Sequence, residues 1–160
     1  MHRFTLTLAA LAALLLPGAA AAASCQVAQN QAAVAAQVLK LANAQRSAAG
    51  LPALAASPAL SKAALAHACD MQRTGKFDHN GSGGSTHASR ARAAGCQWKG
   101  ALAENIGHGY RTPEQAMAGW MGSAGHRANL LNRKVKIGGA AWVPGGTGGG
   151  YWVMEFAGAC

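Results

Sequence analysis

The chain has 160 residues, of which 51% are hydrophobic and 12% are charged. This share of apolar residues excludes a disordered, strongly charged polymer, and the absence of a sustained heptad repeat excludes a coiled coil. Lys and Arg number 14 against 5 for Asp and Glu, so the formal net charge at pH 7 is +9. A chain of this length is typical of one domain.

The N-terminal segment, residues 1–23, has the residue order of a secretory signal peptide. A basic start at Arg3 precedes a short apolar run, which ends at a Pro-Gly pair followed by alanines. The apolar run is shorter than the ~20 residues of a membrane-spanning helix, so a permanent anchor is the weaker interpretation. We predict cleavage before Ser24, which removes one positive charge and leaves +8. Residues 24–160 are then a single domain, extracellular or periplasmic, that does not span a membrane.

Four helices and three strands are expected along the rest of the chain. Apolar residues recur at helical spacing in the first two helical segments, and Ser57 and Thr112, each followed by proline, are typical N-terminal caps. The helices are predicted over residues 26–49, 58–74, 86–94 and 113–122, and the strands over residues 102–107, 135–143 and 151–157. Helices that cover a small sheet indicate the α+β class.

A glycine-rich segment, PGGTGGG at residues 144–150, joins the last two predicted strands. It is predicted as a flexible hairpin loop, which makes these strands antiparallel neighbours. A phosphate-binding loop is the alternative, but the segment lacks the Lys-Ser/Thr pair and the following helix of that motif.

Four cysteines follow the predicted signal peptide, at Cys25, Cys69, Cys96 and Cys160. An even number of cysteines in an exported chain indicates two disulfides. Four cysteines allow three connectivities, and their spacing does not choose among them. None has the C-x-x-C spacing of a zinc ribbon or a thioredoxin-type motif.

Acidic residues are few, and one of them lies in an unusual place. Glu104 sits within an apolar segment, LAENIG, which is predicted as a strand. A carboxylate is costly to bury unless it is paired or hydrogen-bonded. Alternation along a strand puts Glu104 and Ile106 on one face and Asn105 on the other. We therefore expect Glu104 to line a cleft beside a partner.

Two histidines are candidates for that partnership. His79 lies in a turn-rich segment, and His126 follows a predicted helix, whereas His67 is expected in or near the core. Two imidazoles and Glu104 can bind a divalent cation such as Zn²⁺ and leave one position open for water. Because no local pair of the HExxH kind is present, a hydrogen-bonded polar cluster that joins three segments is the competing interpretation, and spacing alone favours it.

Neither a serine nucleophile nor a specific nucleic-acid site is expected. Ser123 lies in the sequence MGSAG, which lacks the first glycine of the G-x-S-x-G pattern. The basic residues are scattered and do not alternate with aromatic residues, which argues against specific nucleic-acid binding. A basic exported protein is better suited to anionic envelope lipids, cell-wall polymers or acidic glycans.

Several motifs resemble, in the same order, those of one family. They are NAQR from Asn43 to Arg46, FDHNGS from Phe77 to Ser82, AENI from Ala103 to Ile106 and WMGSAGHRANLLN from Trp120 to Asn132. Through them the chain is similar to bacterial secreted CAP domains, of the cysteine-rich secretory protein, antigen 5 and pathogenesis-related group, also called SCP-like. The resemblance covers nearly all of residues 34–157.

The resemblance implies an α-β-α sandwich, in which helices flank a small, mainly antiparallel central sheet. It also implies a cleft with His79, Glu104 and His126, lined in addition by Ser123 and Asn105. The two histidines and the glutamate would hold Zn²⁺ or another divalent cation there. Many members have a second acid in the helix before the last histidine. This chain has Ser123 at that place, which weakens an argument for catalysis by two carboxylates.

The same resemblance bears on the disulfides. The implied fold places the first and third helices on one side of the sheet and the second helix on the other. This arrangement favours the pairs Cys25–Cys96 and Cys69–Cys160.

The family has no single shared activity. Members have been associated with sterol and lipid binding, with divalent metals and with host or defence interactions. For this chain the resemblance implies a secreted, non-enzymatic binding module whose partner is lipid, sterol or envelope material. The alternative is a zinc-dependent, peptidase-like hydrolase in which Glu104 acts as the base.

Overall fold

The computed structural model describes residues 24–145 and 148–160. The predicted signal peptide and two residues of the predicted hairpin loop lie outside the described residues. The helices are α1 (Gln31–Ala48), α2 (Pro58–Thr74), α3 (His87–Ala93), α4 (Pro113–Gly122) and α5 (Ala124–Leu130), with a 3₁₀ turn at Ser82–Gly84. The strands are β1 (Ala55–Ala56), β2 (Lys99–Tyr110), β3 (Ile137–Pro144) and β4 (Gly150–Ala159).

The strands form one sheet in the order β1-β3-β4-β2. β4 pairs antiparallel with both β2 and β3, and only the two-residue β1 runs parallel to its neighbour β3. The sheet is therefore mainly antiparallel, as expected. Its two edges are β2 on one side and β1 with the free part of β3 on the other.

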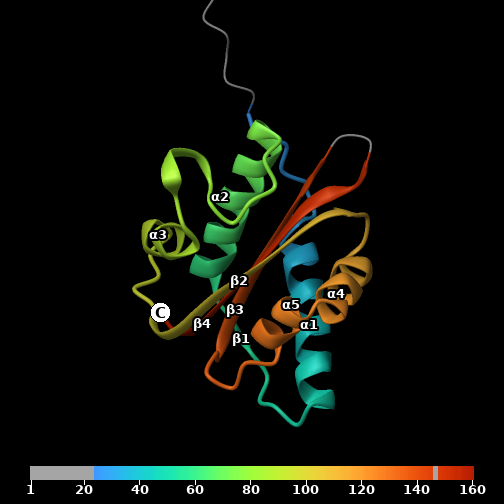
Figure 1. Ribbon diagram of the computed structural model, residues 1–160, viewed down its shortest axis with the longest axis vertical. Helices are drawn as coiled ribbons and strands as arrows, with labels where there is room; N and C mark the ends of the chain where they lie inside the picture. Colours follow the sequence, from blue (N-terminus) through green and yellow to red (C-terminus); the bar gives the residue numbers. More distant parts are fainter. Residues whose placement is uncertain (1–23, 146–147) are drawn as a thin grey trace, which may run out of the picture.

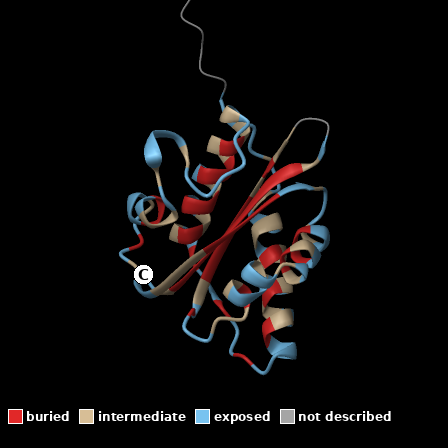
Figure 2. Cartoon of the chain, in the orientation of Figure 1, coloured by how far each residue is buried: buried red, intermediate tan, exposed pale blue. Residues whose placement is uncertain are grey.

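Helices cover both faces of this sheet (Figure 1). α1, α4 and α5 pack on one face around Trp120 and Phe156, whereas α2 and α3 pack on the other around Met71 and Val153. Figure 2 shows the buried residues concentrated along the central strands and on the inner sides of the helices. These three layers are the α-β-α sandwich that the family resemblance implied. Within the described residues, none of the helices has the length and apolar character needed to cross a bilayer.

The predicted helix ends have the predicted causes. The Ser57 hydroxyl accepts a hydrogen bond from the backbone N–H of Leu60, and the Thr112 hydroxyl accepts one from Gln115. Gly75 ends α2 with a φ of +69°, a conformation that glycine adopts without a steric penalty. Capping residues therefore set these helix ends, whereas α1 begins at Gln31 and not at residue 26 as predicted, and its N-cap Asn30 makes no side-chain hydrogen bond.

A buried arginine ties three segments together on the α1 side. The Arg46 side chain, 1% exposed, lies at the end of α1. Its guanidinium donates to the carbonyls of Pro52, Leu130, Asn132 and Val135, at distances of 2.8 to 3.3 Å. The loop after α1, the end of α5 and the segment before β3 are joined at this one side chain.

The disulfide pairing expected from the family resemblance is wrong. The bonds join Cys25 to Cys69 and Cys96 to Cys160. The third helix, α3, lies beside α2 and not beside α1, since Ala91 packs with Leu60. Cys96, which follows α3, is thereby brought to the end of β4, while the segment before α1 runs along α2 and meets Cys69.

Candidate functional site

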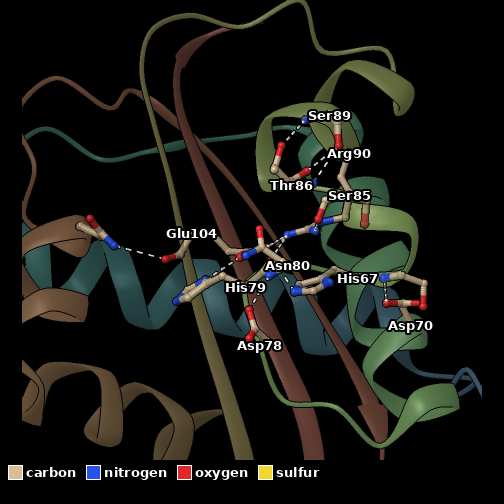
Figure 3. Close-up of polar contacts among 12 residues, drawn as sticks. His67, Asp70, Asp78, His79, Asn80, Ser85, Thr86, Ser89, Arg90 and Glu104 are labelled. Atoms are coloured by element: carbon tan, nitrogen blue, oxygen red, sulfur yellow. Dashed lines mark hydrogen bonds and ion pairs between the residues drawn. The ribbon is translucent and has the colours of Figure 1, made fainter.

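The candidate site lies at the edge strand β2, where polar side chains from both faces of the sheet meet. The Glu104 side chain faces α2 and α3, where His67, His79 and Arg90 gather around it (Figure 3). The edge-facing carbonyls of Glu104 and Ile106 accept hydrogen bonds from Asn129 and from the Trp120 indole. Side chains of α4 and α5 thus cover the outer edge of β2.

Glu104 is buried and bonded through both oxygens. Its Oε1 lies 2.7 Å from Nδ1 of His79, and its Oε2 accepts a hydrogen bond of 2.7 Å from the Arg90 guanidinium. The side chain is 1% exposed. Burial alone would raise the pKa of Glu104, but the hydrogen bonds from His79 and Glu155 and the charge of Arg90 hold that pKa at about 2. Glu104 is a permanent anion at physiological pH.

A second buried carboxyl, Glu155, lies directly opposite Glu104 on β4. The backbone carbonyl of Glu104 points to the outer edge of the sheet, so the backbones of Glu104 and Glu155 do not hydrogen-bond to each other. Side chains of such a cross-strand pair lie closer together than those of a hydrogen-bonded pair. Burial and then the charge of Glu104 raise the pKa of Glu155 well above its ordinary value. Burial of both carboxyls therefore opposes ionisation of Glu155 while Glu104 carries its charge.

His79 is the exposed member of the cluster. Its side chain is 51% exposed, and its backbone carbonyl accepts a hydrogen bond from Arg90. The hydrogen bond to Glu104 is the main cause that raises the pKa of the His79 imidazole, although partial burial opposes it. With Nδ1 turned toward Glu104, the other ring nitrogen, Nε2, is left for groups outside the cluster.

His126 and Asn105 come from the other side of the edge. The Asn105 side chain is fully buried, donates to the backbone carbonyl of His126 and accepts from Asn129. Asn105 therefore holds α5 against β2 and is not free to contact a ligand. The His126 ring is half-buried; burial and then the charge of His79 lower the pKa of this imidazole.

Ser123 lies between α4 and α5 and makes no side-chain cap hydrogen bond. Its backbone N–H donates to Trp120 and its carbonyl accepts from Arg127. The residue serves as the joint between the two helices. Ser123 makes no polar contact with Glu104, whose hydrogen-bond partners are His79 and Arg90.

The geometry does not fit a three-ligand metal site. Among the described residues, no group of three or more His, Cys, Asp or Glu side chains is placed to hold a metal ion. Glu104 instead bonds to His79 and Arg90. It therefore acts as a carboxylate that orients the His79 imidazole, and not as a ligand. Binding of zinc or another divalent cation by His79, His126 and Glu104 stays a prediction.

Sequence reasoning missed three members of the cluster. Arg90 pairs with Glu104, Glu155 lies opposite it on β4, and His67 lies 3.9 Å from it, fully buried. Glu155 had a usable signal, because it is an acid inside an apolar strand, just as Glu104 is. Arg90 had none, because nothing local distinguishes it from the other scattered basic residues.

The chain matches the cysteine-rich secretory protein family, CAP, over residues 39–156. It is 35% identical over 122 residues to the uncharacterized protein YkwD of Bacillus subtilis. The aligned region covers 76% of this chain but only 46% of YkwD. A crystal structure of an extracellular protein containing a SCP domain from Bacillus anthracis is similar with a TM-score of 0.72 and 26% identity, over 81% of this chain and 41% of the other. An outer surface protein from Borrelia burgdorferi shares the fold, with a TM-score of 0.66 and 18% identity over 78% of this chain and 89% of the other. The chain therefore spans less than half of the Bacillus relatives. It belongs to the cysteine-rich secretory protein family.

Proposed function

We propose that this domain is a secreted, non-enzymatic binding module that contacts the phosphate or carboxylate groups of envelope lipids or glycans. One observation carries the proposal: His79 is half-exposed and is held on the buried anion of Glu104. A protonated imidazole fixed in this way presents an oriented Nε2–H donor to an anion outside.

The same contacts argue against hydrolysis. A general base needs a pKa near the working pH and access to the water that it activates. Glu104 has a pKa of about 2, is 1% exposed and is bonded to His79 and Arg90. Glu155 is fully buried, and burial and the charge of Glu104 raise the pKa of its carboxyl well above the ordinary value. Neither carboxyl has the access and basicity that the hydrolase alternative requires.

Three further features support an anionic partner outside the cell. The two disulfides suit an oxidising compartment. The chain carries nearly three basic residues for each acidic one, 14 against 5. Two structural relatives are described as an extracellular protein and an outer surface protein. A basic surface on an exported protein attracts anionic lipids and polymers.

The test is vesicle co-sedimentation of the exported protein. Phosphatidylcholine vesicles are compared with vesicles that also contain phosphatidylglycerol, at about pH 5.5 and about pH 7.5. We expect binding to the anionic vesicles alone, stronger at the lower pH. His79→Asn should weaken it by about tenfold, the worth of one charge-assisted hydrogen bond.

His108→Asn is the matched control, because His108 is an exposed imidazole on the same strand as Glu104 and stacks on Tyr151. It should leave vesicle binding unchanged. Equal binding to neutral or sterol-containing vesicles would contradict the proposed anionic partner. Peptide or ester hydrolysis lost in Glu104→Gln would contradict the non-enzymatic role.

A further inference from the structure

One end of the sheet carries a group of basic side chains that takes no part in the histidine cluster. In Figure 1 the start of β2, the segment before β3 and the mark of the C-terminus lie together at the lower end of the molecule. The exposed cations of this part are Arg92, Lys99, Arg133, Lys134 and Lys136, which together form the basic end.

The backbone holds the three lysines around the end of β4. A Cβ added at Gly158 would lie 2.6 Å from the carbonyl oxygen of Lys99 and 3.3 Å from that of Lys134. The N–H of Lys136 donates to the carbonyl of Ala157 at 2.9 Å. Because β2 and β3 flank β4 and neighbouring strands are about 5 Å apart, these lysine backbones lie within roughly 10 Å of one another. This separation is close to the Debye length of physiological salt, so the fields of the three charges add.

Arg92 is held at the same end by a disulfide and by a stacking contact. The Cys96–Cys160 bond ties the segment after α3 to the end of β4. The guanidinium carbon of Arg92 lies 5.3 Å from the centre of the Trp98 ring, and Trp98 directly precedes Lys99. This contact places the Arg92 charge beside that of Lys99.

No acidic side chain offsets the basic end. The acidic residues of the chain, all of them described, are Asp70, Asp78, Glu104, Glu114 and Glu155. Glu104 and Glu155 are buried, and Glu114 begins α4, which follows the opposite end of β2 from Lys99. A terminal carboxylate at Cys160 would offset only one of the five positive charges.

The two aspartates lie far along α2. This helix starts beside Cys160, whose sulfur lies 3.7 Å from the Ser57 hydroxyl. At 1.5 Å per residue, Asp70 lies about 18 Å further along the helix, and Asp78 follows the helix end. The basic end is therefore a surface with one sign of charge.

The exposed apolar side chains also lie at the far end of α2. Among the described residues, the large apolar side chains that are exposed are Val27 and Phe77. Phe77 follows the end of α2, and Val27 follows Cys25, which is bonded to Cys69 near that end. Stable attachment to a bilayer takes an apolar anchor in addition to charge. The basic end lacks such an anchor among the described residues, which favours a partner that stays in water.

The kind of side chain restricts this partner further. Bases of single-stranded nucleic acid stack on exposed aromatic rings, but the Trp98 ring already carries the Arg92 guanidinium. The ammonium groups of lysine are point charges that fix no bidentate geometry. Such a surface responds to repeated negative charge along a chain and not to the shape of a single group.

We propose that the basic end binds a linear polyanion, a flexible chain with a phosphate or carboxylate in each repeat unit, such as an anionic cell-wall polymer. The chain would lie across the ends of β2, β4 and β3 and contact several cations at once. The proposal goes beyond the one at His79 and uses other residues, so that each can fail without the other.

The test measures binding of long-chain inorganic polyphosphate to the exported protein at about pH 7.5, over a series of salt concentrations. Lys99→Gln, Lys134→Gln and Lys136→Gln are combined in one variant of the basic end. We expect this variant to bind at least about tenfold more weakly, with a slope of log affinity against log salt that is shallower by about 2 to 3. Polygalacturonate, a carboxylate chain with fewer charges per unit length, should bind more weakly than polyphosphate and depend on the same lysines.

The matched control combines Lys40→Gln, Lys62→Gln and Lys76→Gln, which removes the other three lysines of the chain, all exposed, and the same net charge. This control, the combined Lys→Arg variant of the basic end and His79→Asn should each bind polyphosphate nearly as wild type does. Equal weakening by the two sets of Lys→Gln substitutions would overturn the proposal, because net charge alone would then explain binding. So would a basic-end variant that loses phosphatidylglycerol vesicles but keeps polyphosphate, or single-stranded DNA that binds more tightly than polyphosphate of equal charge.

Discussion

The residues around Glu104 and Glu155 are arranged to stabilise one negative charge on Glu104, while burial and that charge raise the pKa of Glu155. Arg90 and His79 bond to the ionised Glu104, whereas His67 is buried, with its pKa lowered by burial. A fully ionised pair would place two negative charges on neighbouring strands against one buried guanidinium. The cluster is therefore a structural support for His79, with its charges balanced inside the fold.

Replacing Glu155 by Gln should make the stability of the protein less sensitive to a rise in pH above 4.5, the ordinary pKa of the carboxyl. Because the pKa of Glu155 is raised on folding, its contribution to stability is complete below the ordinary value of 4.5 and is lost as the pH rises toward the raised value. The neutral amide of Glu155→Gln still donates to Glu104 and has no proton to lose. Urea denaturation at several pH values should show that the free energy of unfolding of the variant increases relative to that of wild type as the pH rises.

Glu104→Gln and Glu114→Gln complete that comparison. Glu104→Gln leaves the Arg90 guanidinium without its buried anion, and we expect a loss of about 3–5 kcal/mol. Glu114→Gln changes an exposed acid of α4 and should leave the slope from neutral to alkaline pH unchanged. If the dependence of the free energy of unfolding on pH is the same in Glu155→Gln as in wild type, Glu155 is already ionised in the folded protein.

Zinc should bind weakly at His79 and His126, because Glu104, the third expected ligand, is bonded to His79 and Arg90, and no three such side chains among the described residues are placed to hold a metal ion. We expect no stoichiometric zinc at about micromolar concentration in an isothermal titration at neutral pH. Tight binding that His79→Ala and His126→Ala both remove would contradict this expectation. That result would restore the divalent cation site suggested by the sequence.

Among the elements, the long helices and strands and the capped seven-residue α3 were predictable, whereas α5 and β1 were not. α2 and α4 begin and end where Ser57, Gly75 and Thr112 place their caps. The seven-residue α5 and the two-residue β1 are too short to carry periodicity, and neighbouring elements fix them. His126 consequently lies inside α5 and not in the loop expected after α4. Motif order located Glu104, His79 and His126, whereas Arg90 and Glu155 joined the site only through tertiary packing.

The tie at Arg46 should be one of the most sensitive positions outside the cluster. Arg46→Lys keeps the charge but cannot reach four carbonyls, and the buried acceptors left behind are costly. We expect a loss of about 3 kcal/mol in the free energy of unfolding, measured by urea denaturation. Arg133→Lys, at an exposed arginine in the adjacent segment, should change stability little. Equal effects of the two substitutions would mean that the carbonyl contacts add nothing.

At the scale of the whole molecule, the sheet separates two surfaces with different chemistry. The β2 edge is polar, with His79 exposed over a buried ionic cluster, whereas the β3 edge has an apolar groove with one lysine. The two disulfides lie on the α2 and α3 side and fix both ends of the described chain to it.

The central place of β4 also determines when this protein can acquire its shape. Among the described elements, β2 pairs only with β4, and β3 pairs only with β4 and the two residues of β1, yet β4 follows all of them in the chain. In a chain that emerges N-terminus first, the sheet therefore cannot close until β4 has emerged. The Cys96–Cys160 bond can form only after Cys160, which follows β4, has emerged as well.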